Sequence, residues 1–163
     1  MRKLTAALLL VILGATGSPA QNSPSALSGK INANNINIRS DSTVSATTIC
    51  KMNAGDDVEV VRETYDWYKI KLPASAPAFI KRDFAISIDE KTARVLKDNV
   101  NIRLRPDEAS PILGRVNKNE RVAILKDNNG WYKIEPTGNS FGWVHKKFVN
   151  LANPARPARK AKH

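Results

Sequence analysis

The chain has 163 residues, a formal net charge of +11 and a single cysteine, Cys50. One cysteine excludes an internal disulfide, so a folded domain of this chain depends on its apolar core. The length suits one ordinary domain or two small ones. We expect Cys50 to be a buried, inert thiol, the alternative being a disulfide between two copies of the chain.

The first 20 residues have the composition of a secretory signal peptide. Arg2 and Lys3 make a charged start, residues 4–15 are apolar, and Ser18-Pro19-Ala20 offers the small residues of a cleavage site. The alternative is a membrane anchor, but the apolar run is short for a span, which needs roughly 20 residues. We therefore expect residues 1–20 to be a signal peptide and the protein to be exported to the periplasm or the extracellular space.

Two short sequence motifs each occur twice, and the distance between the two motifs is the same both times. NINIR at 35–39 returns as NVNIR at 99–103, and DWYKI at 66–70 returns as GWYKI at 130–134. A shift of 64 residues superposes both pairs without a gap and also brings Phe84 onto Phe148. Such a gap-free register predicts an internal duplication.

Each unit of the repeat reads as a series of short strands. In the second unit, Val100 and Ile102 alternate with polar residues, as do Tyr132 and Ile134, which is the period of a half-buried sheet. Turn residues separate the strands, and no window outside the first 20 residues has a helical stripe. The pattern predicts an all-β fold of two tandem small β-barrels. Residues 88–94 are expected to be a short, stiff linker between them.

These motifs resemble those of the bacterial SH3-like (SH3b) domain. The segments NVNIR, VNKNERVAIL, GWYKI and FGWVHKKFV carry the resemblance in the second unit, and NINIR, MNAGDDVEVV, DWYKI and AFIKRDFA carry it in the first. The resemblance covers residues 30–88 and 94–151, and it implies two tandem SH3-like barrels that bind peptidoglycan or peptides. Unit one has Ala78-Phe79-Ile80 where unit two has Gly142-Trp143-Val144. This difference leaves open whether unit one binds the same ligand or is structural.

Residues suited to catalysis are few. Beyond the signal peptide, the histidines and cysteine of the chain are Cys50, His145 and His163. Cys50 aligns with Gly114 in the repeat, and His145 aligns with Lys81 at a strand end, which indicates a solvated surface position. A zinc site needs three protein ligands or more. We therefore predict no enzyme, no catalytic residue, no metal site and no cofactor.

Strand parity predicts the binding residues. If Ile134 faces the core, Trp131 and Lys133 face solvent, and the same reasoning exposes Arg103 beside Ile102. An exposed aromatic ring next to cations can stack on a sugar or peptide face while the cations hold carboxylates or phosphates. The predicted ligand-binding residues are Trp131, Lys133, Arg103, Trp143, Trp67 and Arg39. The structural alternatives are that the tryptophans close the barrels and the arginines bond nearby carbonyls.

The positive charge is concentrated towards the end of the sequence. Residues 29–91 hold nine basic and nine acidic side chains, whereas residues 92–151 hold eleven and six, or +5. Residues 152–163 form a basic tail, expected to be disordered, that would make weak, salt-sensitive contacts with an anionic surface.

The pattern as a whole predicts a binding protein of the cell envelope. We expect an exported, non-enzymatic module that recognises peptidoglycan, another cell-wall polymer or another envelope ligand. The alternatives are an adaptor that binds an envelope protein in the periplasm, or a charge-driven polyanion binder. No specific nucleic-acid partner is expected.

Overall fold

The structure, a computed structural model, describes residues 27–152, and these form β-strands joined by turns and two short 3₁₀ helices. The predicted signal peptide and all but the first residue of the predicted tail lie outside the described residues. Within residues 27–152, no helix is long and apolar enough to cross a membrane. The all-β prediction is confirmed.

The elements of the two halves correspond in order. The first half contains β1 (Leu27–Ile31), β2 (Ile36–Arg39), β3 (Thr48–Met52), β4 (Asp57–Thr64), β5 (Trp67–Lys71), β6 (Ala78–Lys81), η1 (Arg82–Phe84) and β7 (Ala85–Asp89). The second contains β8 (Thr92–Val95), β9 (Val100–Arg103), β10 (Ile112–Val116), β11 (Arg121–Asn128), β12 (Trp131–Ile134), β13 (Phe141–His145), η2 (Lys146–Phe148) and β14 (Val149–Leu151). After a shift of 64 residues, each element begins within one residue of its counterpart.

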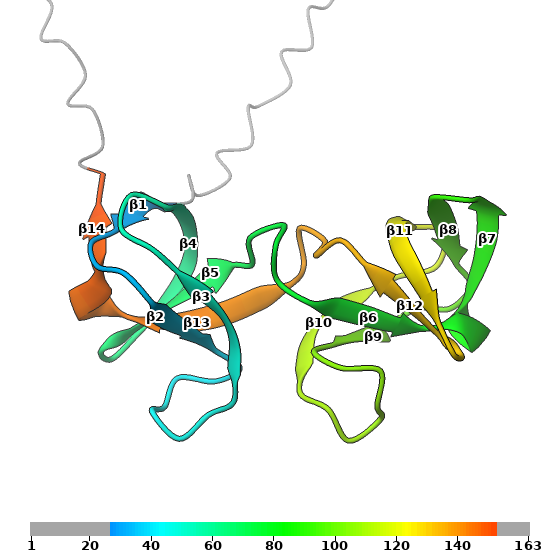
Figure 1. Cartoon of the computed structure of the whole chain (residues 1–163), viewed down its shortest axis with the longest axis horizontal. Coiled ribbons are helices and arrows are strands. Elements are labelled where there is room, and N and C mark those ends of the chain that lie inside the picture. The colour runs from blue at the N-terminus through cyan, green and yellow to red at the C-terminus, as the bar shows by residue number, and fades with distance from the viewer. Residues whose placement is uncertain (1–26, 153–163) are drawn as a thin grey trace, which may run out of the picture.

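The two sheets exchange a pair of strands, β6 and β7 for β13 and β14. Their orders are β14-β1-β4-β5-β13-β2-β3 and β10-β9-β6-β12-β11-β8-β7. The late strand β13 pairs with β5 and β2, and the early strand β6 pairs with β12 and β9. Figure 1 shows β13 and β6 leaving the middle of the molecule in opposite directions. We call residues 27–72 with 141–151 the first lobe, and residues 78–134 the second lobe.

The lobes therefore do not coincide with the ranges 30–88 and 94–151 that the repeat defines. The chain crosses between them at 72–78 and again at 134–141. Residues 88–94, expected as the linker, are instead part of a hairpin in which β7 pairs with β8. A hairpin satisfies the backbone N–H and C=O groups that a linker would leave to solvent.

Gly142 lets β13 enter the first lobe. It lies opposite Ile70, and a Cβ atom at this position would stand 2.6 Å from the Ile38 side chain and 2.9 Å from that of Leu72. In the second lobe the equivalent position is Ala78, whose methyl group is fully buried. Each exchanged strand thus carries the side chain that its host lobe accommodates.

Apolar side chains fill the interior of both lobes. Ile38, Ile70 and Val144 in the first lobe have no exposed surface. Ile80, Ile102 and Ile134 are buried to the same extent in the second. Burying one such side chain contributes about 1.5–3 kcal/mol. Because Val144 and Ile80 come from the exchanged strands, the exchange is part of each core.

Equivalent polar contacts hold the exchanged segments to their hosts. The N–H of Arg82 donates to the carbonyl of Gly130 (2.9 Å), and the N–H of Lys146 donates to that of Asp66 (2.8 Å). Arg82 also forms an ion pair with Asp127 (3.0 Å), and Lys146 forms one with Glu63. Exposed ion pairs add little stability, so they mainly orient the 3₁₀ turns.

Candidate ligand-binding pockets

The repeated asparagines shape the turn at the rim of each lobe. Asn35 and Asn99 have φ values of 58° and 56°, in the left-handed region that asparagine tolerates better than most residues. The N–H of Asn35 donates to Oδ1 of Asn53, and that of Asn99 donates to Oδ1 of Asn117, each over 3.1 Å. The first asparagine of each motif therefore serves to form the turn through its backbone.

The repeated arginines brace a loop in each lobe. Nη1 of Arg39 donates to the carbonyl of Ala46, and Nη1 of Arg103 donates to that of Ser110, both over 2.8 Å. This is the structural role considered from the sequence. Because each guanidinium has five N–H donors, the bond leaves donors for a ligand.

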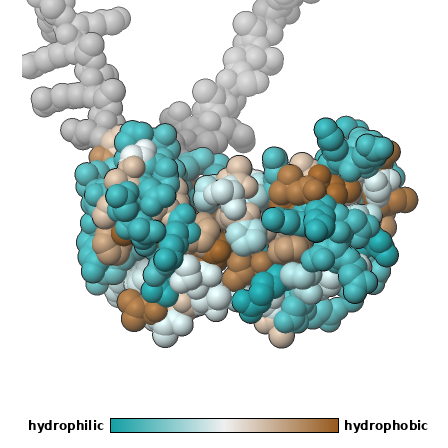
Figure 2. All heavy atoms as spheres, viewed as in Figure 1, coloured by the Kyte–Doolittle hydropathy of each residue, from teal (hydrophilic) through white to brown (hydrophobic). Residues whose placement is uncertain are grey.

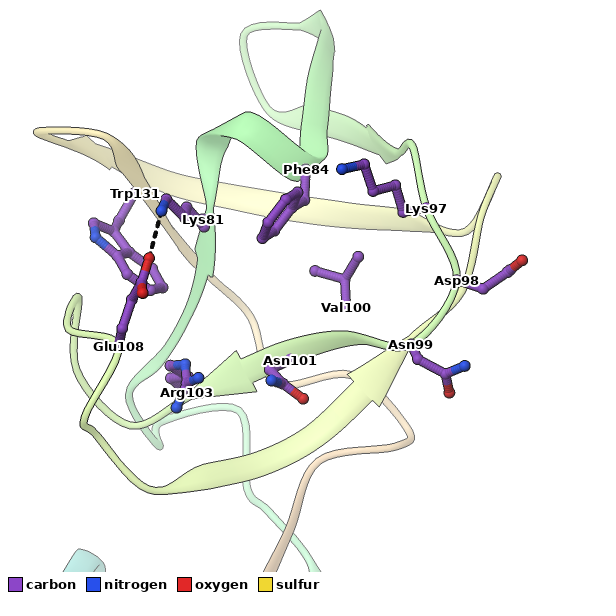
Figure 3. A pocket seen from close by; sticks show the side chains of 10 residues that line it. All are labelled: Lys81, Phe84, Lys97, Asp98, Asn99, Val100, Asn101, Arg103, Glu108 and Trp131. Carbon is purple, nitrogen blue, oxygen red and sulfur yellow. Dashed lines mark hydrogen bonds and ion pairs between the residues drawn. The ribbon is translucent and has the colours of Figure 1, made fainter.

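A pocket of about 310 Å³ lies in the second lobe. Trp131 on β12 and Arg103 on β9 contribute to it, as does Glu108 from the loop after β9 (Figure 3). Lys81 and Phe84 belong to the exchanged segment β6–η1. The residues lining this second-lobe pocket are Lys81, Phe84, Lys97, Asp98, Asn99, Val100, Asn101, Arg103, Glu108 and Trp131.

An ion pair between Lys81 and Glu108 lies beside Trp131 in the second-lobe pocket (Figure 3). Its hydrogen bond and charge attraction raise the pKa of Lys81 and lower the pKa of Glu108. Both groups are therefore ionised at neutral pH, and each partly neutralises the field of the other.

A second pocket of about 240 Å³ occupies the equivalent place in the first lobe. The residues lining this first-lobe pocket are Asn35, Ile36, Asn37, Arg39, Val44, Trp67, His145, Lys147 and Phe148. Three of them, His145, Lys147 and Phe148, come from the exchanged segment β13–η2. Each pocket is thus completed by residues from the other half of the chain.

His145 joins two aromatic rings in the first-lobe pocket. Its ring centroid lies 5.3 Å from that of Trp67 and 6.2 Å from that of Phe148. Its Nδ1 accepts the N–H of Lys147 at 3.3 Å. The sequence indicated a solvated surface position for His145; the side chain is half-buried and lines the pocket, because β13 pairs with β5 and brings His145 opposite Trp67.

The structure separates the predicted binding residues into two pairs and two single residues. Trp131 and Arg103 meet in the second-lobe pocket, and Trp67 and Arg39 meet in the first-lobe pocket. All four are half-buried rather than fully exposed.

Lys133 and Trp143 line neither pocket. Lys133 lies opposite Phe79 on β6. Trp143 lies in the first lobe, and Nζ of Lys69 is 5.9 Å from its ring and 4.7 Å from that of Phe141. Burial and the nearby charge of Arg62 lower the pKa of Lys69.

Sequence reasoning missed the pocket residues that the exchange supplies: Lys81, Phe84, His145, Lys147 and Phe148. It also missed Glu108, which a loop contributes. One signal was present, because Phe84 and Phe148 coincide under the shift of 64 residues. Nothing in the register indicated that each would serve the opposite lobe.

The exchange also redistributes charge. The first lobe holds eight basic and six acidic side chains, and residues 73–140, which form the second lobe with its crossings, hold twelve and nine. The net charges are therefore +2 and +3. The asymmetry between 29–91 and 92–151 along the sequence nearly disappears in space.

Cys50 is half-buried at the edge of the first-lobe core. Burial raises the pKa of its thiol to about 11. At neutral pH the thiol is therefore protonated and a weak nucleophile. Among residues 27–152, no group of three or more His, Cys, Asp or Glu side chains is arranged to hold a metal ion.

Residues 98–150 match the family model of the bacterial SH3 domain. The matched range runs from the turn before β9 to β14, so its strands are divided between the two lobes. The chain is also 21% identical over 151 residues to YrvJ of Bacillus subtilis (strain 168), described as a candidate N-acetylmuramoyl-L-alanine amidase. That alignment covers 85% of this chain and 29% of YrvJ. The chain thus spans less than a third of the relative's length.

Proposed function

We propose that the protein is an exported, non-enzymatic module of two SH3-like lobes that binds peptidoglycan or another cell-wall polymer. The observation that carries the proposal is the pair of equivalent pockets, each combining a tryptophan, an arginine and asparagine amides. Rings of this kind stack on sugar faces, while the polar groups orient the ligand. The SH3 match at residues 98–150 and the similarity to the candidate amidase support a place at the cell wall.

Co-sedimentation with purified cell wall tests this proposal. The protein with its first 20 residues removed should pellet with the polymer and remain bound at high salt, because stacking and hydrogen bonds are screened less than surface charges. Combined replacement of Trp67 and Trp131 by alanine should abolish the binding. Lys133→Ala is the matched control, since Lys133 lies outside both pockets.

Two results would count against the proposal. Loss of all binding at moderate salt would favour the charge-driven polyanion binder. Absence of binding at low salt by a folded protein would remove the cell wall as ligand.

The adaptor function is the second candidate. Strand β7 forms an edge of the second sheet, and its residues Ile86 and Ile88 are each 50% exposed. Figure 2 shows a mainly polar surface with an apolar area on the second lobe. An edge strand with exposed apolar side chains is a site where another chain can add a strand. Ile86→Lys should disrupt such a contact without affecting cell-wall binding.

A further inference from the structure

The two pockets differ in charge at two equivalent positions, and we infer that the first-lobe pocket is the anion-selective one. Its ligand carries a carboxylate or a phosphate next to a flat apolar or sugar face. The inference rests on the proposed binding function and names the chemistry that the first-lobe pocket recognises.

The first equivalent position lies on the loop after β2 or β9. It is Val44 in the first lobe and Glu108 in the second, and a shift of 64 residues relates them. The Glu108 carboxylate forms an ion pair with the ammonium group of Lys81. An anion that enters the second-lobe pocket must displace this carboxylate or accept its repulsion. Val44, 73% exposed, offers neither competition nor repulsion.

The second position lies at the end of the exchanged strand. It is His145 in the first lobe and Lys81 in the second. Where Lys81 places a flexible cation, His145 places a ring that connects Trp67 to Phe148. The His145 ring is tilted by 59° to the Trp67 ring and by 68° to the Phe148 ring, so the three rings form an angled aromatic wall. Each ring of this wall offers a face on which a planar or sugar group of the ligand can stack.

The lining charges agree with this assignment. Arg39 and Lys147 line the first-lobe pocket, and none of its lining residues is acidic. Nζ of Lys147 stands 4.9 Å from the Phe148 ring centroid, so the cation lies next to the aromatic wall. In the second-lobe pocket, Asp98 and Glu108 oppose three basic residues. The formal charge of the lining residues is therefore +2 in the first-lobe pocket and +1 in the second-lobe pocket, and an anionic group meets no carboxylate in the first.

Reciprocal substitutions test the inference. Val44→Glu gives the first-lobe pocket the carboxylate of the second, and Glu108→Val removes it there. Both positions are exposed loop residues, so both variants should fold, which a thermal melt verifies. The probes are N-acetylmuramic acid, which carries a carboxylate, glycerol phosphate, and the neutral sugar N-acetylglucosamine. The indole N–H resonances of Trp67 and Trp131 report on the two pockets separately in an NMR titration.

At neutral pH, N-acetylmuramic acid should shift the Trp67 resonance at lower concentration than the Trp131 resonance. N-acetylglucosamine should show no such preference. Val44→Glu should weaken the Trp67 response to the anionic sugar at least tenfold, and Glu108→Val should strengthen the Trp131 response. A response to glycerol phosphate alone would assign the pocket to a phosphate polymer or headgroup. A response to N-acetylmuramic acid would assign it to a carboxylated sugar.

Three outcomes would overturn the inference: no Trp67 response to either anion, an equal response to the neutral sugar, or an unchanged response in Val44→Glu. These results are distinguishable from failure of the proposed function. If the protein does not sediment with cell wall while Trp67 still responds selectively to anions, the cell-wall function fails and the charge selectivity stands. If the protein sediments with cell wall and Trp67 shows no selectivity for anions, the charge selectivity fails and the cell-wall function stands.

Discussion

The His145 ring packs against the Trp67 ring at a centroid distance of 5.3 Å, although the two residues lie in different halves of the sequence. The contact exists because β13 occupies the place in the first sheet that β6 occupies in the second. The wall of the first-lobe pocket is therefore built by both halves of the sequence, and changes to β13 should affect ligand binding at Trp67.

Truncation of the pocket tryptophans should weaken binding more than folding. Trp67→Ala and Trp131→Ala should each remove about 2 kcal/mol of binding free energy at their own pocket, about a thirtyfold loss of affinity, as expected of an aromatic anchor. Affinity for soluble cell-wall fragments and melting temperature should be measured on the same preparations.

The alternative for these residues is a purely structural role. In that case each variant would melt at a lower temperature and would lose affinity only through unfolding. A variant with unchanged stability and unchanged affinity would exclude that tryptophan from the binding site.

Gly114→Ala should destabilise the protein strongly. An added Cβ atom would stand 1.7 Å from the backbone carbonyl oxygen of Asn139, on the crossing segment that bridges to Gly114 through Ser140. Backbone cannot rotate away as a side chain can, so we expect a loss of about 3 kcal/mol or more in the free energy of unfolding. Chemical denaturation measures it.

Cys50→Ala is the matched control for this prediction. Cys50 is equivalent to Gly114 under the shift of 64 residues, and it already carries a Cβ atom. It should therefore lose much less stability. Equal stability of Gly114→Ala and the wild type would mean that the crossing takes another path.

A disulfide should report the strand exchange directly. Lys71 lies opposite Phe141 in the β5–β13 ladder. Directly opposed residues of antiparallel strands have Cα atoms about 4.5–5.5 Å apart, within the range a disulfide bridges. In a Cys50→Ala background, Lys71→Cys with Phe141→Cys should form an intramolecular disulfide under mild oxidation.

Mass spectrometry at low protein concentration distinguishes the products. A crosslinked monomer supports exchange within one chain. A crosslinked dimer would place β13 in the sheet of a second copy, and absence of any crosslink would contradict the pairing.

The Cys50 thiol should react slowly in the folded protein. Burial raises its pKa from 9.0 to about 11, which lowers the thiolate fraction at pH 8 about a hundredfold. Alkylation by iodoacetamide should accelerate with pH up to about 11 and become fast at pH 8 in denaturant. Rapid alkylation of the native protein at pH 8 would contradict the inert-thiol interpretation.

Local patterns in the sequence determined most elements of the fold. Alternation of apolar and polar residues predicted the strands, and the repeated motifs at 35–39 and 99–103 indicated equivalent positions in the two halves. Parity placed Tyr132 and Ile134 inside, where they are buried. These features depend on residues close together in the chain. Their physical basis is the two-residue period of a strand, which can be recognised from the sequence alone.

Tertiary structure alone decided which copy completes which sheet. Strands β6 and β13 carry similar alternating patterns, and either could hydrogen-bond to β5 or β12, because backbone ladders do not distinguish side chains. The choice depends on non-local packing, such as the space that only Gly142 leaves beside Ile38. It placed His145 beside Trp67 and Lys81 beside Glu108, and it thereby decided which chemistry each of the two equivalent pockets has.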